Sequence, residues 1–222
     1  LIVAVLYLPR RPVPASGRVL KIHVIRAALT AVMAYLFFFG LTRIPLAQAI
    51  GLSFIAPIIT LFLAVPILGE RIGANAKLAA VLGFVGVMVV VGGELLAADE
   101  GSDAVGMVAV LLSAVMYAFN LVLQRMQALV ARPLEIAFYQ NTIVFLMLLV
   151  GVPFAVSWPA SSYQWGGAAL AAGLAVGSLM LMSLAYRQAE AQRLVVIEYT
   201  AFIWAAILGW RLFAEPITAR TL

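Results

Sequence analysis

The sequence predicts an all-α polytopic membrane protein built as an inverted-repeat helical bundle, and three observations predict it. Hydrophobic residues make up 65% of the chain and charged residues only 10%, and a water-soluble fold cannot bury that much apolar surface. Apolar runs of about 20 residues, the length that crosses a hydrocarbon core, recur along the chain with short polar connectors between them. The two halves of the chain also align with each other at a fixed offset.

The apolar runs predict seven complete membrane-spanning helices. They lie near residues 22–42, 46–68, 76–97, 104–124, 135–157, 165–187 and 192–214. Residues 1–8 resemble the end of another helix, and the chain stops at Leu222 just after what resembles the entry to a further one. We therefore expect a fragment of a longer membrane protein.

The basic residues predict the orientation, because Lys and Arg are retained on the cytoplasmic side of a membrane. Alternate connectors hold eleven of them on one side and three on the other. The rich side contains the Arg10 to Lys21 loop, which we therefore expect to be cytoplasmic, in the plasma or inner membrane of the cell. The net charge of +5 is spread between apolar runs and does not form one patch, so nucleic acid is not an expected partner.

Composition also bears on chemistry. The chain has no cysteine and a single histidine, so neither a metal site nor a disulfide framework is expected. No Gly-rich phosphate-binding motif occurs, and no convergent set of acids or His indicates catalysis. We expect no cofactor and no enzyme activity.

An offset of 145 residues aligns the two halves without a gap between residues 41–72 and 186–217. Glu70 then meets Glu215, each at the end of its helix. The charge count places Glu70 inside and Glu215 outside, so the two units have opposite orientations, as in the inverted repeats of many transporters. The predicted domains are a first repeat over residues 1–97 and a second over residues 104–222.

Several motifs of the first half are similar to those of the EamA family of the drug/metabolite transporter superfamily. They are Leu46-Ala47-Gln48-Ala49, Ala56-Pro57, Ile67-Leu68-Gly69-Glu70 and Gly83-Phe84-Val85-Gly86-Val87; in the second half Tyr199, Trp204 and the segment 209–215 are similar as well. The resemblance implies ten helices in two five-helix inverted repeats. It also implies transport of a small organic solute such as an amino acid, a metabolite, a cofactor-like compound or a drug.

Polar residues inside the spans are the candidates for substrate binding or coupling, because such residues usually face the bundle interior. Ser113, Tyr117, Asn120 and Gln124 share one helical face, which would line a cavity or form interhelical hydrogen bonds. A second block, residues 139–142, contributes Gln140 and Asn141. Pro57 predicts a kink in the middle of its helix, which would serve either a binding site or packing alone.

Glu198 is the most informative candidate because it lies inside a predicted span, where charge is costly. It must be paired, hydrated by a cavity or the cytoplasmic interface, or protonated, and in the last case it would carry protons. Tyr199 and Trp204 would line the same cavity with aromatic faces, or pack and anchor the helix.

Other polar and small residues are expected to be structural. Glu70 and Glu215 would each cap the segment that follows, and His23 and Arg26 would snorkel to the cytoplasmic surface. Gly173 and Gly177 form a small-xxx-small pair that predicts close helix packing.

The sequence therefore predicts a secondary transporter that works by alternating access, driven by protons or by substrate exchange. The alternative is a structural or accessory multi-pass membrane protein without a saturable ligand. Expected partners are a small-molecule substrate and the lipid bilayer, and a homodimer stays open. Substrate identity, transport direction, coupling ion and oligomeric state do not follow from the sequence.

Overall fold

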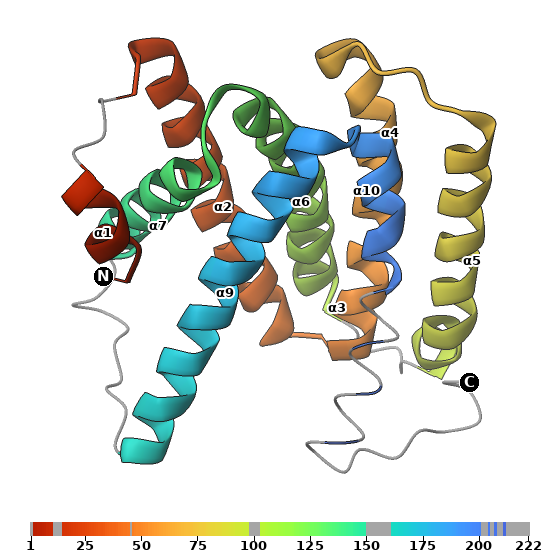
Figure 1. Cartoon of the computed structure of the whole chain (residues 1–222). Coiled ribbons are helices and arrows are strands. Elements are labelled where there is room, and N and C mark those ends of the chain that lie inside the picture. Colours follow the sequence, from red (N-terminus) through yellow and green to blue (C-terminus); the bar gives the residue numbers. More distant parts are fainter. Residues whose placement is uncertain are drawn as a thin grey trace. The chain divides into compact units, whose positions relative to one another are not determined.

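A computed structural model describes residues 2–10, 15–44, 46–97, 103–149 and 161–200, together with 204, 207 and 211. The described part of the chain is helical and contains no strand. In Figure 1 the helices are coloured by their order in the sequence, from red at the N-terminus to blue. Their bounds are α1 Ile2–Tyr7, η1 Leu8–Arg10, α2 Gly17–Leu41, α3 Leu46–Ser53, α4 Ile55–Leu68, α5 Ala74–Ala97, α6 Ala104–Val130, α7 Pro133–Leu149, α9 Ser162–Gln188 and α10 Ala191–Glu198.

Four described segments are long and apolar enough to cross a membrane: Gly17–Leu41, Ala49–Leu68, Ala104–Val130 and Ser162–Gln188. Each coincides with a span predicted from the apolar runs. The chain is therefore an integral membrane protein with an all-α fold, as the composition predicts.

The predicted span 46–68 is not one continuous helix. It is divided into α3 and α4, and Phe54 separates them. Pro57 lies in the first turn of α4 and is buried. Because proline has no backbone N–H, it cannot donate to the carbonyl of Ser53, four residues earlier. Phe54 N–H still bonds back to the carbonyls of Ile50 and Gly51 at 3.2 Å each, which closes α3.

The chain forms two compact units that each draw on both halves of the sequence. Unit 1 comprises residues Leu1–Ala31 and Leu123–Ala189, and unit 2 comprises Val32–Val122 and Glu190–Leu222. Helices α2 and α6 contribute residues to both units.

In unit 2, α10 packs against α4 and α5, and α3 packs against α5 (Figure 1). Small residues let the helices approach closely: Ala56 of α4 meets Ala114 and Ala118 of α6, with Ile55, Ile59 and Leu63 packed around them. A second cluster joins Ile44, Ala49 and Val110. Close contact between small side chains is a common way for membrane helices to associate.

Helices α2 and α6 cross most tightly in unit 2 at Gly40 and Gly106. A Cβ at Gly40 would collide with the side chain of Val110 and lie 3.0 Å from the Gly106 carbonyl oxygen. A Cβ at Gly106 would lie 2.8 Å from the Cβ of Arg43. Only glycine fits this crossing, and the two segments run antiparallel.

In unit 1, α7 packs against α9 and α1. The pair of Gly173 and Gly177 on α9 does not mark a packing site within the described residues, because a Cβ at either position would meet no described atom within 4 Å. The prediction of close packing there was therefore wrong for the part of the chain that the structure describes.

An ion pair stabilises the start of α6 in unit 2. Arg43 Nη1 lies 2.5 Å from Asp103 Oδ2, and Asp103 Oδ1 accepts from Val105 N–H at 2.8 Å and Gly106 N–H at 3.3 Å. The hydrogen bond from Arg43, aided by those two backbone N–H groups, lowers the pKa of Asp103 below its ordinary value of 3.8.

Because this pKa is lowered, the charged form of Asp103 stabilises the fold above pH 3.8, and that contribution disappears as the pH falls through the lowered value. We expect Asp103→Asn to lower the melting temperature more at about pH 6 than at about pH 3, because the wild-type acid loses its charge as the pH falls through its lowered pKa. Melting curves at the two pH values test this. An equal melting temperature at about pH 6 would contradict it.

Candidate functional site

Glu198 is the last residue of α10 and forms the centre of a candidate site in unit 2. Tyr117 of α6 donates its hydroxyl to Glu198 Oε2 at 3.2 Å. The other carboxylate oxygen, Oε1, is buried and has no hydrogen-bond partner among the described residues. A buried carboxylate oxygen without a donor is costly, so this atom is available to a proton or a ligand.

The neighbouring Tyr199 joins α10 to the interruption between α3 and α4. Its ring stacks on Phe54 with centroids 5.6 Å apart, and its hydroxyl donates to the Phe54 carbonyl at 3.3 Å. On α5, Gly83 makes room for the ring, since a Cβ there would lie 2.6 Å from Tyr199 Cδ2. The candidate carboxylate therefore lies at the end of a helix that is held against the interruption between α3 and α4.

The N-terminus of α10 is held by residues that follow α4. Gly69 ends α4 with a left-handed φ of 70°, which glycine adopts without strain. Glu70 then accepts from Ala191 N–H at 3.2 Å through Oε1 and from Gln192 N–H at 3.5 Å through Oε2. In return, Gln192 Oε1 accepts from Gly73 N–H at 2.9 Å.

Glu70 therefore caps α10, which begins about 120 residues later, whereas the sequence predicted a cap of the following helix α5. The helix that carries Glu198 is bonded at both described ends to residues of the first half. Glu215, the aligned acid of the second half, lies outside the described residues.

The predicted polar stripe of α6 faces the protein interior. Asn120 is buried, and Ser113 donates its hydroxyl to the Met33 carbonyl at 2.7 Å, within unit 2. Gln124, in unit 1, accepts from Arg26 Nη2 at 3.0 Å. Ser113 and Gln124 form interhelical hydrogen bonds, one of the two alternatives that the spacing left open.

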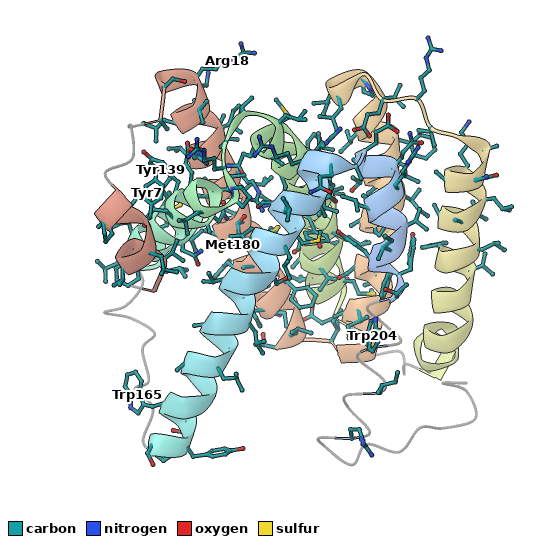
Figure 2. All side chains as sticks on the ribbon, in the orientation of Figure 1. Tyr7, Arg18, Tyr139, Trp165, Met180 and Trp204 are labelled. Atoms are coloured by element: carbon teal, nitrogen blue, oxygen red, sulfur yellow. The ribbon has the colours of Figure 1, made fainter. Side chains whose placement is uncertain are left out.

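The remaining candidates have different environments. Gln140 of α7 is buried and donates Nε2–H to Thr30 Oγ1 at 2.8 Å, in unit 1. Asn141 is exposed and donates to the Ala137 carbonyl of its own helix at 2.8 Å. Trp204, in unit 2, is 62% exposed, and no described contact joins it to Glu198 (Figure 2).

His23 and Arg26 do not snorkel to the surface, and that prediction was wrong. His23 is fully buried and Arg26 is 4% exposed. In unit 1, Arg26 Nη1 donates to Gln127 Oε1 at 2.8 Å, and Gln127 Nε2 lies 2.9 Å from His23 Nδ1. A buried guanidinium requires acceptors, and the two glutamines of α6 supply them.

A model of the EamA-like transporter family matches residues 1–92 and 104–222. The chain belongs to this family. A riboflavin transporter of Rhizobium johnstonii is 27% identical over 198 residues, which cover 86% of this chain; the chain spans 62% of the length of that relative. A solved crystal structure of a protein matches with a TM-score of 0.73 and 20% sequence identity, over 99% of this chain and 78% of the other. The match to the solved structure supports only the fold of this chain, because the sequence identity is 20%.

Proposed function

We propose that the complete protein is a secondary transporter that moves a small organic solute by alternating access, and that Glu198 carries the coupling proton. Family membership supports transport, and the single observation that carries the role of Glu198 is its buried Oε1 atom, which has no hydrogen-bond donor among the described residues. A carboxylate in that position is neutral when it binds a proton and costly when it does not. The protonated, neutral form of Glu198 is therefore favoured in the buried position, and the deprotonated, charged form is favoured in a hydrated one.

The surroundings of Glu198 support this role. Tyr117 offers a hydroxyl to one oxygen, and Tyr199 links the next position to the interrupted helix at Phe54. Interrupted helices are where transporters commonly bind substrates and coupling ions, because their free backbone groups must be satisfied inside the protein. Movement at the break would change what surrounds the carboxylate.

For the substrate we propose a planar, neutral heteroaromatic compound, with riboflavin as the first to test. The similarity to a riboflavin transporter motivates this choice. The ring of Tyr199, the residue after Glu198, and the ring of Phe54, which stacks on it, are of a type that suits a planar ligand. Asn120 is buried on the face of α6 that carries Tyr117.

We also propose how the protein is oriented in the membrane and which partners it has. The Arg10 to Lys21 loop lies on the cytoplasmic side of the cell membrane because basic residues favour that side. The partners are the solute and the bilayer, and no enzyme activity is involved. The competing hypothesis is an accessory membrane subunit, which would bind no solute saturably.

Ligand binding by the purified complete protein separates these hypotheses. Riboflavin at 100 times its dissociation constant should raise the free energy of unfolding by about 2.7 kcal/mol and therefore raise the melting temperature. Amino acids, polyamines and cationic drugs serve as comparison classes. A saturable shift with one of those classes, but not with riboflavin, would identify a different substrate and support the transporter hypothesis. No shift with any class would favour the accessory subunit.

A further inference from the structure

A chain of polar groups in unit 1, all buried except Glu135, joins α2, α6 and α7. It runs from Arg26 through Gln127 and His23 to Glu135, whose Oε1 lies 3.6 Å from His23 Nε2. The ring of Tyr139 stacks on His23 with centroids 4.7 Å apart, and Tyr7 of α1 lies beside Tyr139 (Figure 2). The proposed role of Glu198 makes no use of these groups.

The guanidinium of Arg26 determines how the Gln127 amide is turned. A guanidinium has only N–H donors, so the amide atom 2.8 Å from Arg26 Nη1 must be the oxygen. The amide nitrogen of Gln127 consequently faces His23. An amide nitrogen can only donate, so it can bond His23 Nδ1 only when Nδ1 carries no proton.

The same reasoning places the imidazole proton on the other nitrogen. With Nδ1 as the acceptor, a neutral ring carries its proton on Nε2. Nε2 has no hydrogen-bond partner among the described residues, and Glu135 Oε1 is the carboxylate oxygen near it, 3.6 Å away. Protonating both nitrogens would set two N–H groups against each other at 2.9 Å unless the Gln127 amide turned and presented its donors to Arg26.

We propose that Arg26, acting through Gln127, holds His23 as the neutral Nε2–H tautomer, with that N–H directed at the Glu135 carboxylate. His23 is then a positioning residue that donates toward Glu135. Glu135, whose side chain is 20% exposed, is the member of the pair that solvent reaches. This inference stands independently of transport and of Glu198.

Nitrogen NMR of the complete protein with ¹⁵N-labelled histidine tests the proposal, and a His23→Gln variant assigns the signal. At about pH 8, above the ordinary imidazole pKa of about 6.5, we expect Nδ1 to be unprotonated and Nε2 to be protonated. In Gln127→Glu a carboxylate oxygen replaces the amide nitrogen, so Nδ1 should gain a proton.

Gln124→Glu is the matched control, because it adds the same charge beside Arg26 on a residue that bonds Nη2 and not His23. It should keep the wild-type pattern. If Gln127→Glu does not fold, Glu135→Gln should shift the Nε2 resonance and leave Nδ1 unprotonated. A protonated Nδ1 in the wild type, an unchanged pattern in Gln127→Glu, or identical changes in both glutamine variants would overturn the proposal.

Discussion

Replacing Glu198 by glutamine is expected to abolish proton-driven accumulation of substrate by the complete protein. Glutamine keeps the size of the side chain and an oxygen that can accept from Tyr117, but it cannot release and bind a proton. One pH unit is worth 1.36 kcal/mol, which corresponds to about tenfold accumulation if one proton moves with each substrate. The expected ratio of internal to external substrate therefore falls from about 10 to about 1.

Proteoliposomes with an imposed pH gradient measure this ratio, and exchange without a gradient provides the internal comparison. Glu190→Gln is the matched control, because Glu190 lies at the other end of α10 and its carboxylate accepts from Gln192 Nε2 at 2.5 Å. The control should accumulate substrate normally. If Glu198→Gln retained accumulation while Glu190→Gln lost it, the coupling role would belong elsewhere; loss of exchange as well as accumulation would point to substrate binding at Glu198.

The apolar runs correctly predicted the four described segments that are long and apolar enough to cross a membrane, because that property depends on length and composition. Length and composition did not predict the interruption at Phe54. Pro57 makes the local weakness visible in the sequence, but the Phe54 carbonyl is bonded by the hydroxyl of Tyr199, which lies 145 residues away. A partner that distant leaves no mark in the local pattern.

The error on His23 and Arg26 has the same cause. Both lie near the end of a predicted span, where long cationic side chains usually reach the surface. Their partners are on α6, about 100 residues later. One signal was present, because Gln127 continues the polar stripe of α6 three residues beyond Gln124, and a stripe that long on an apolar helix requires polar groups opposite it.

Only part of the candidate site was predictable, because its contacts join residues that are distant in the sequence. A lone acid inside an apolar span stands out by composition, so Glu198 was found. Its contact with Tyr117, and the position of Phe54 beside Tyr199, depend on how α4, α6 and α10 pack in unit 2. The functional roles of these residues stay predictions.

Glu70→Ala is expected to destabilise the fold by about 0.5–2 kcal/mol, the range for removing a helix cap. The substitution leaves the N–H groups of Ala191 and Gln192 without the carboxylate that accepts from them. Glu70→Gln, which keeps one acceptor oxygen, should lie between Glu70→Ala and the wild type. Unfolding of the complete protein in detergent, followed by temperature or denaturant, measures the order.

The informative control is Glu190→Ala, because Glu190 precedes α10 directly and sequence alone would assign the cap to it. Its side chain makes no capping hydrogen bond. Glu190→Ala should therefore cost less than Glu70→Ala, although Glu70 lies about 120 residues from the helix. The reverse order would show that α10 is capped locally. In that case, Glu70 would not hold the helix that carries Glu198 to the end of α4.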